Sequence, residues 1–222
     1  MINSQVVSVV DEMLQEVILV QCPHCGETVP LAGFCERCKR ILPPAERSYW
    51  EVLGYDREIM NLDPADLEKR FFELSRKFHP DRFASKSALE VQVSHDHSSA
   101  VNNAYRTLKD PVARAGCLVE RKLGAVSEKS AKVPPEMAEF FFEVQEYLEE
   151  IRHSGGNPPE NAVREVRKAE ETLGEKVKDL DARLQASFLE YDASPDIRIV
   201  EEMKEILAER SYIKSFQREM GR

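Results

Sequence analysis

Four cysteines near the start of this 222-residue chain have the spacing of a metal site. They form two Cys-x-x-Cys pairs with nine residues between the pairs: Cys22, Cys25, Cys35 and Cys38. Each pair can present two thiolates to one ion, and four thiolates at roughly 2.3 Å suit a tetrahedral Zn²⁺ ion. Gly26 and Gly33 suit the tight turns that such pairs need. Because four sulfurs leave no open coordination position, we expect the zinc to be structural rather than catalytic.

Two other roles for these cysteines are weaker. Disulfides are disfavoured because no Lys or Arg precedes Arg37, so the basic region of a secretory signal and the arginines of a mitochondrial transit peptide are both missing. A redox dithiol is disfavoured because no thioredoxin-like βαβ pattern follows. We therefore expect a cytoplasmic protein, with an already processed organellar form as the alternative, in which His24 and Cys117 take no part in the metal site. His95 and His97, on a later predicted helix, are expected to face solvent.

A second candidate site is the tripeptide His79-Pro80-Asp81, which follows a predicted amphipathic helix. Asp63 is a suitable N-cap for this helix, and Pro64 suits its first position. Its apolar residues recur at steps of four, three and four, as a buried stripe does: Leu67, Phe71, Leu74 and Phe78. Its opposite face is basic and carries Lys69, Arg70, Arg76 and Lys77.

The basic face contrasts with the whole chain, which has 40 acidic and 31 basic residues and a net charge of −9. Such a face on an acidic protein favours an acidic protein partner over nucleic acid, although an isolated run of cations is usually a solvated surface. The tripeptide alone could also be an ordinary turn. Its surroundings make it specific: a short first helix closed by Gly54, and a third helix with an apolar stripe over 100–108.

Four segments resemble the HscB family of iron–sulfur cluster co-chaperones: YWEVLG at 49–54, HPDRF at 79–83, VNNAYRTL at 101–108 and DPVARA at 110–115. The resemblance implies a J-domain that docks on a DnaK- or HscA-type chaperone and stimulates its ATP hydrolysis. It also implies that a C-terminal helical domain delivers an IscU-type scaffold protein. Eukaryotic-type members often carry a similar pair of cysteine knuckles before the J-domain.

The expected fold is all-α: a J-domain helical hairpin and a C-terminal three-helix bundle, preceded by a small zinc-ribbon-like segment. The expected parts are a cysteine segment over 1–45, a J-domain over 46–124 and a client-binding bundle over 134–222. Breaks at 154–159 and at Ser194-Pro195 divide the bundle into antiparallel helices. The long middle helix is expected to bury a stripe spaced by threes and fours: Val163, Val166, Leu173, Val177, Leu180, Leu184, Ser187 and Tyr191. Residues 1–20 are expected to form a short helix leading into a strand at 17–21.

An aromatic residue on the first bundle helix is a candidate for client binding. Phe142 points away from the predicted core stripe, which contains Met137, Phe141, Val144, Leu148 and Ile151. The HscB resemblance implies a scaffold-binding surface made of Phe141, Phe142, Gln145, Glu146, Glu149 and Tyr212. Gln145 stands where the family more often has an apolar residue, and single surface aromatics are common without any partner.

These features together predict a co-chaperone that is not an enzyme, because the sequence offers no nucleophile with a base, no phosphate loop and no open metal site. One alternative is a general J-protein that recruits another client. A second alternative is a zinc-ribbon nucleic-acid binder, supported only by Arg37, Lys39 and Arg40. No uninterrupted apolar window approaches the roughly eighteen residues of a membrane span.

Overall fold

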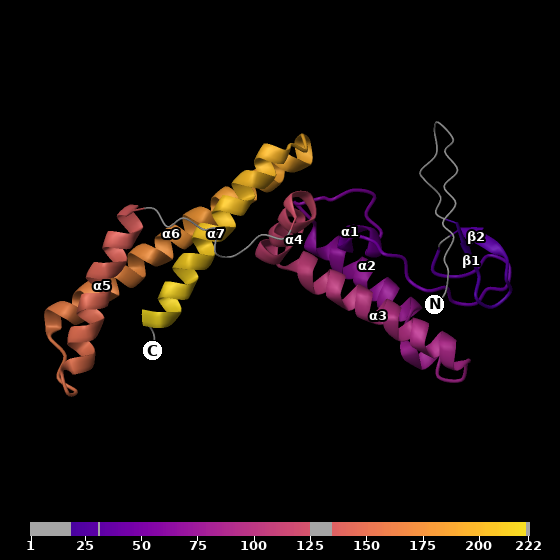
Figure 1. The fold of residues 1–222 in the computed structure, drawn as a ribbon, viewed down its shortest axis with the longest axis horizontal. Helices are drawn as coiled ribbons and strands as arrows, with labels where there is room; N and C mark the ends of the chain where they lie inside the picture. The colour runs from indigo at the N-terminus through magenta and orange to yellow at the C-terminus, as the bar shows by residue number, and fades with distance from the viewer. Residues whose placement is uncertain (1–18, 31, 125–134, 221–222) are drawn as a thin grey trace. The chain divides into compact units, whose positions relative to one another are not determined.

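The computed structural model describes residues 19–30, 32–124 and 135–220, which form a helical protein with a small two-stranded sheet (Figure 1). The chain divides into two compact units, Met1–Asp110 and Pro111–Arg222. The predicted all-α class is confirmed. The helix expected before residue 17 lies outside the described residues, whereas the expected strand is observed over Leu19–Gln21.

The N-terminal part of the first unit is a cysteine segment, residues 19–42. Strand β1 (Leu19–Gln21) pairs antiparallel with β2 (Thr28–Pro30), so that Val20 lies opposite Val29. Its small core consists of Cys22, Val29, Cys35 and Leu42. Since two of these four buried residues are cysteines of the candidate metal site, the core and the site depend on each other.

Three helices follow in the first unit: α1 (Tyr49–Val52), α2 (Pro64–Lys77) and α3 (Ala88–Lys109). A capping box between Ser48 and Glu51 starts α1, and Gly54, with a φ of 78°, ends it in the left-handed region that favours glycine. Trp50 of α1 is fully buried, and its Nε1 donates to the carbonyl of Ile59 at 2.7 Å.

Helices α2 and α3 form the expected antiparallel hairpin, and α1 packs on α3 (Figure 1). The N-cap prediction is confirmed, because the Asp63 side chain accepts a hydrogen bond from the Ala65 backbone N–H at 3.1 Å. Across the hairpin Phe71 stacks on Tyr105, with ring centroids 4.1 Å apart. The stripes that the sequence assigned to these two helices therefore face each other.

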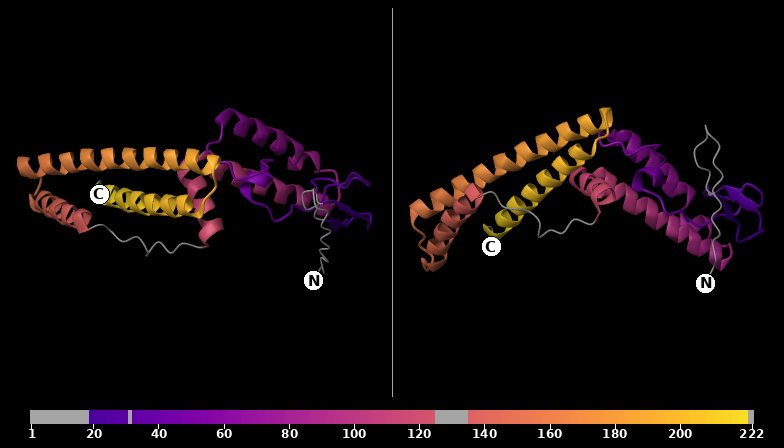
Figure 2. Two further views of the ribbon diagram at one scale, coloured as in Figure 1. Left: turned by 90° about the horizontal axis from the view of Figure 1, so that it is seen from above. Right: turned by 45° about the horizontal axis from the view of Figure 1, so that its top comes forward.

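The second unit contains α4 (Pro111–Leu123), α5 (Pro135–His153), α6 (Glu160–Ala193) and α7 (Ile197–Met220). The long helix α6 is its spine: α5 lies along the N-terminal part of α6, and α7 runs back along the C-terminal part (Figure 2). Helix α4, which the sequence interpretation grouped with the J-domain, packs against α7. The functional division into three parts stays a prediction.

The core stripe of α6 differs from the expected one at its N-terminal end. From Leu173 to Tyr191 the predicted residues are buried, but Val163 is exposed, and Ala162 and Ala169 are buried instead. The helical phase set from Leu173 onward points these two alanines inward. The expectation was wrong here because it preferred the more hydrophobic valine to alanine.

No helix within the described ranges is long and apolar enough to cross a bilayer.

We predict that Leu180→Ala destabilises the second unit by about 2–5 kcal/mol, because Leu180 is almost fully buried on α6 and its loss leaves a cavity. Urea unfolding followed by circular dichroism measures this change. The matched control is Leu189→Ala on the same helix, where the side chain is exposed and the cost should stay within about 0.5 kcal/mol. Equal effects of the two changes would contradict the assigned core.

Candidate functional site

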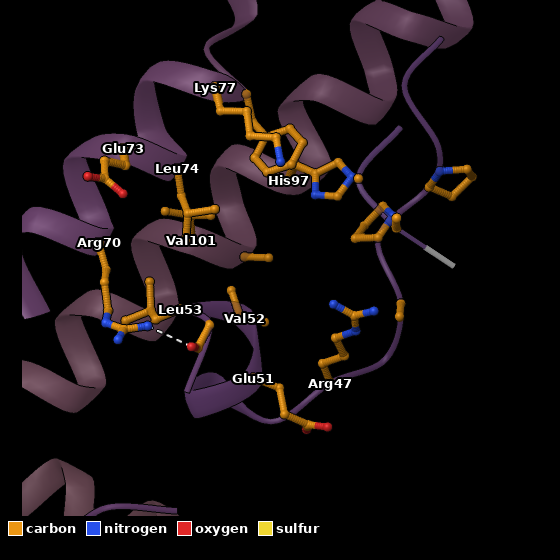
Figure 3. Close-up of a pocket in the computed structure, with 18 residues that line it drawn as sticks. Arg47, Glu51, Val52, Leu53, Arg70, Glu73, Leu74, Lys77, His97 and Val101 are labelled. Carbon is orange, nitrogen blue, oxygen red and sulfur yellow. Dashed lines mark hydrogen bonds between the residues drawn. The ribbon is translucent and has the colours of Figure 1, made fainter. Parts of the chain in front are cut away.

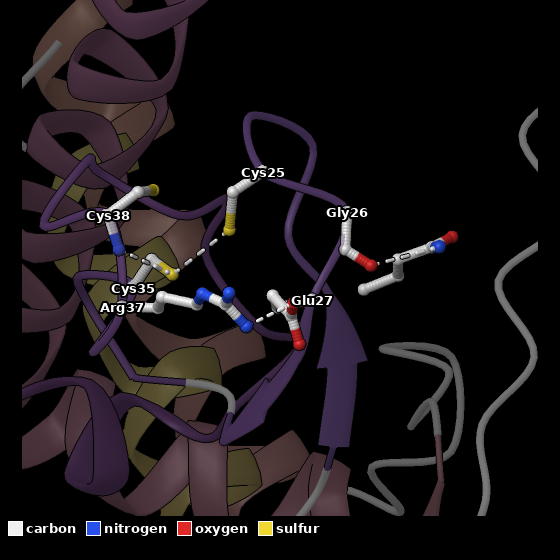
Figure 4. Close-up of polar contacts among 7 residues, drawn as sticks. Cys25, Gly26, Glu27, Cys35, Arg37 and Cys38 are labelled. Carbon is white, nitrogen blue, oxygen red and sulfur yellow. Dashed lines mark hydrogen bonds and ion pairs between the residues drawn. The ribbon is translucent and has the colours of Figure 1, made fainter.

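The two Cys-x-x-Cys pairs sit on two copies of the same turn. In the first, the Gly26 N–H donates to the Cys22 carbonyl at 2.9 Å; in the second, the Lys39 N–H donates to the Cys35 carbonyl at 2.9 Å. Gly26 and Lys39 occupy equivalent places, and both have positive φ values, 75° and 60°. The repeated turn brings the sulfurs of the two pairs together, and Figure 4 shows the Cys25 sulfur pointing toward that of Cys35.

The four sulfur atoms have the spacing of a tetrahedral metal site. Cys22 Sγ lies 3.7 Å from Cys38 Sγ, and Cys25 Sγ lies 3.8 Å from Cys35 Sγ. All four atoms lie within 4.8 Å of one another. A tetrahedron with metal–sulfur distances of roughly 2.3 Å has edges of about 3.8 Å. The cluster can therefore hold one metal ion, and its four cysteines are free thiols rather than disulfides.

The four thiols cannot all lose their protons easily, because the resulting thiolates would repel one another at these distances. The backbone N–H of Cys38, 3.4 Å from Cys35 Sγ, is the main cause that lowers the pKa of Cys35 to about 7. A backbone hydrogen bond at Glu27 lowers the pKa of Cys25, but burial and the neighbouring thiols outweigh it and raise that pKa to about 11. A bound cation would remove this repulsion and allow all four to be thiolates.

His24 lies outside the group of four sulfurs, and its Nε2 lies 3.2 Å from the carbonyl oxygen of Ile41. Beside the cluster, Arg37 and Glu27 form an exposed ion pair that links the second knuckle to the first (Figure 4).

The His-Pro-Asp tripeptide forms an exposed turn between α2 and α3. Pro80–Arg82 is a single 3₁₀ turn, η1, and His79 is its N-cap, with Nδ1 accepting from the Asp81 N–H at 3.3 Å. The side chains of His79 and Asp81 are 52% and 90% exposed, so both are available to a partner. Arg82 donates to the carbonyl of Arg76 at 3.2 Å and ties the turn back to α2.

Phe78, the residue before the turn, is held from several sides. Its carbonyl accepts hydrogen bonds from Ser94 Oγ at 2.8 Å and Ser98 Oγ at 3.0 Å, both on α3. Its ring stacks on His97 with centroids 4.1 Å apart, and on Phe34 of the cysteine segment with centroids 5.7 Å apart. These contacts fix the point at which α2 ends and the turn begins.

His97 is not solvent-facing, contrary to the expectation from sequence. Its Nε2 donates to the Leu42 carbonyl at 2.8 Å, and its ring lies against Phe78. Burial is the main cause that lowers the pKa of His97 below its usual value, so the ring is neutral at pH 7. The expectation failed because a residue that faces outward from a two-helix hairpin can still be covered by a segment distant in sequence.

Of the four predicted cations on α2, three are exposed and one is engaged inside the unit. Lys69, Arg76 and Lys77 are exposed, and Lys77 Nζ lies over the Phe34 and Phe78 rings. Arg70 donates to Asp66 Oδ2 at 2.7 Å and to the Gly54 carbonyl at 2.6 Å, and its guanidinium lies over the Tyr55 ring. The Arg70 hydrogen bond is the main cause that lowers the pKa of Asp66. Arg70 thus joins α2 to the end of α1.

The sequence interpretation missed Phe72, which is 52% exposed on α2 between Arg70 and Arg76. The same reasoning that singled out Phe142 would have found it, because Phe72 also lies next to a stripe residue and points away from the stripe.

A cavity of about 420 Å³ lies between the linker 43–47 and the helices α1, α2 and α3 (Figure 3). Arg47, Lys77 and His97 line it together with apolar residues such as Leu74 and Val101. The linker is therefore only loosely packed on the hairpin.

In the second unit some of the predicted client-binding residues are buried and others are exposed. Phe141 is buried, and its ring contacts those of Tyr212 and Phe216 on α7, with centroids 5.0 and 4.1 Å apart. Phe142 is 73% exposed and Tyr212 is 37% exposed. Gln145 is half-buried, and Glu146 and Glu149 are exposed. Phe142 and Tyr212 are thus the aromatic side chains of this set that solvent reaches.

Comparison with known proteins gives a consistent result. The chain is 29% identical over 206 residues to the mouse iron–sulfur cluster co-chaperone protein HscB, covering 90% of this chain and 81% of the mouse protein. It is 30% identical over 186 residues to the human protein, covering 83% of this chain and 72% of that one. The human HscB crystal structure matches with a TM-score of 0.63 at 23% identity, covering 90% of this chain and 96% of that one. No protein-family model matches the chain.

A helical hairpin with a His-Pro-Asp turn, followed by a helical bundle, is the architecture of a J-domain co-chaperone. The similarity to the human relative extends over most of both chains, and this identifies the particular family. The chain belongs to the HscB family of iron–sulfur cluster co-chaperones.

Proposed function

We propose that this protein stimulates the ATPase of a DnaK- or HscA-type chaperone through its J-domain and delivers an IscU-type scaffold to it through the C-terminal bundle. It performs no chemistry of its own and acts by shifting the equilibrium of its chaperone partner. The observation that carries the proposal is the exposed His-Pro-Asp turn, whose residues His79, Pro80 and Asp81 are presented at the end of a helix with a basic outer face.

The surface next to this turn fits an acidic protein partner. Lys69, Arg76 and Lys77 supply positive charge, and the exposed Phe72 ring adds apolar surface among them. Arg70 contributes by holding α2 against the end of α1 rather than by free charge. An exposed aromatic with Lys69 and Arg76 as helical neighbours gives both steering and affinity.

The bundle supplies the second contact. Phe142, Tyr212, Glu146 and Glu149 form the surface that we assign to the scaffold, with Gln145 at its edge and Phe141 supporting it from the core. The support for this assignment is that Phe142 is exposed and that Tyr212, the only other exposed aromatic of the set, packs against the neighbouring Phe141, so that both rings are available to one partner.

The test of the whole proposal is the steady-state ATPase rate of candidate chaperones with this protein and an IscU-type scaffold, separately and together. We expect more stimulation by the two together than the sum of their separate effects. Stimulation that a scaffold never increases would favour a general J-protein with another client.

We further propose that the cysteine cluster binds one structural Zn²⁺ on Cys22, Cys25, Cys35 and Cys38. Four thiolates are a typical zinc ligand set, and two of the sulfur–sulfur distances, 3.7 and 3.8 Å, match the edges of a tetrahedral zinc site. The site is closed, so the ion would stabilise the cysteine segment and take no part in a reaction.

For the metal site, we predict one zinc per chain in protein purified without chelator, and loss of that zinc in Cys35→Ser. The cysteine segment should lose its fold in this variant while helical content stays nearly unchanged, because the segment contains no helix. Elemental analysis and circular dichroism measure the two effects. Cys117→Ser is the matched control and should keep its zinc. Absence of zinc from the wild-type protein would refute the assignment.

For the chaperone contact, we predict that His79→Gln abolishes ATPase stimulation and changes stability by less than about 0.5 kcal/mol, because the His79 side chain is half-exposed. A chaperone ATPase titration and a urea unfolding curve check both statements. Exposed His95 on α3 gives the control His95→Gln, which should stimulate normally. Full stimulation by the His79 variant would remove the basis of the J-domain proposal.

For the client contact, we predict that Phe142→Ala weakens binding of an IscU-type scaffold by tenfold or more, since a desolvated aromatic contact is commonly worth roughly 1–3 kcal/mol. The melting temperature should hardly move, because the ring is exposed. Isothermal titration calorimetry measures the affinity. Val163→Ala, an exposed apolar change on α6, is the control. Normal scaffold binding by the stable Phe142 variant would locate the client surface elsewhere on the bundle.

A further inference from the structure

The cysteine segment contacts the J-domain hairpin at the His-Pro-Asp turn. The residues on either side of the tripeptide contribute rings to this contact: Phe78 directly precedes His79, and Phe83 follows shortly after Asp81. Both rings are buried, and both stack on Phe34 of the cysteine segment, with centroids 5.7 and 6.5 Å apart. One side chain of the cysteine segment thus spans the two ends of the turn.

The position of Phe34 is fixed by the cysteine cluster. It lies immediately before Cys35, and its backbone forms a bridge with Ile41 across the second knuckle. The adjacent Gly33 lies so close to Phe78 that an added Cβ would come 2.6 Å from the ring atom Cζ. The position of the second knuckle therefore sets the position of Phe34 on the hairpin.

Among the described residues, two further contacts join the segment to the hairpin beside Phe34. The Leu42 carbonyl accepts from His97, and Lys77 Nζ lies 5.5 Å from the centre of the Phe34 ring. Beyond Leu42, the linker leaves the 420 Å³ cavity between itself and the helices (Figure 3). The connection between the cysteine cluster and the turn is therefore concentrated at Phe34 and its neighbours.

We propose that the cysteine segment positions the His-Pro-Asp turn for its chaperone partner, with Phe34 as the positioning residue. When the second knuckle is folded around its metal ion, Phe34 restrains Phe78 and Phe83 and so limits the conformations of the tripeptide between them. Loss of the metal frees Phe34 and loosens the turn. The role in chaperone binding depends on the proposed function, whereas the restraint on the turn can be measured in this protein alone.

The experiment compares the backbone amide signals of His79 and residues 81–83 in ¹⁵N–¹H NMR spectra of the wild-type protein, Phe34→Ala, Phe34→Tyr and Glu36→Ala; Pro80 has no amide hydrogen. We expect these amide signals to shift or broaden in Phe34→Ala and to stay in place in Phe34→Tyr, which keeps the ring. Glu36→Ala, an exposed change in the same knuckle, should leave the signals unmoved. Removing the metal from the wild-type protein with a chelator should reproduce the Phe34→Ala spectrum in this region.

In a chaperone ATPase titration, Phe34→Ala should raise the half-maximal concentration about three- to tenfold, as the loss of stacked aromatic contacts implies, and leave the maximal stimulated rate unchanged. Phe34→Tyr should restore the wild-type value. A wild-type protein that stimulates no chaperone would refute the proposed function but not the restraint, because the amide signals are measured without a chaperone.

Unmoved amide signals at 79–83 in a Phe34→Ala protein that retains its metal would overturn the proposal. Shifted signals with an unchanged half-maximal concentration would overturn the role in chaperone binding. If Phe34→Ala loses its metal, Gly33→Ala replaces it, because this change keeps every cysteine and the Phe34 ring but pushes against Phe78. Unmoved signals at 79–83 in the metal-loaded Gly33 variant would then overturn the proposal equally.

Discussion

The hydroxyl groups of Ser94 and Ser98 both donate to the carbonyl of Phe78. The His-Pro-Asp end of the helical hairpin depends on this arrangement. The last carbonyls of a helix lack partners within that helix, and an unsatisfied buried carbonyl would cost about 1–3 kcal/mol. The serine side chains of α3 satisfy the Phe78 carbonyl and hold it at a fixed position on α3. The termination of α2, the direction of the turn and the exposure of His79 all follow from that anchor.

The sequence allowed the helices to be predicted well because their signals are local. Asp63 and Pro64 mark the start of α2, Gly54 marks the end of α1, and the spacing from Leu173 to Tyr191 gives the buried face of α6. The grouping of the four cysteines could also be predicted, since a Cys-x-x-Cys pair constrains its own geometry. The exposure of Phe142 followed from the helical phase of its neighbours.

The features that could not be predicted depend on contacts between segments distant in sequence. His97 is covered by Leu42, 55 residues away, and nothing in its local pattern indicates this. Gly33 was expected to serve a tight turn, but it is needed because Phe78 leaves no room for a side chain. Arg70 belongs by spacing to a charged face, yet it is held by the Gly54 carbonyl and Asp66. Periodicity gives the direction of a side chain but not what covers it.

The acidic residues around Phe142 have a consequence for the free protein. An exposed phenylalanine on a helix surface gives two copies of the same chain an apolar contact through which to associate. Glu146 and Glu149 lie one and two helical turns beyond Phe142, so a second copy approaching in the same way would bring like charges together. The overall charge of −9 adds to this repulsion. The ring can thus stay uncovered in a concentrated solution of the protein and remain accessible to a partner whose charge differs from its own.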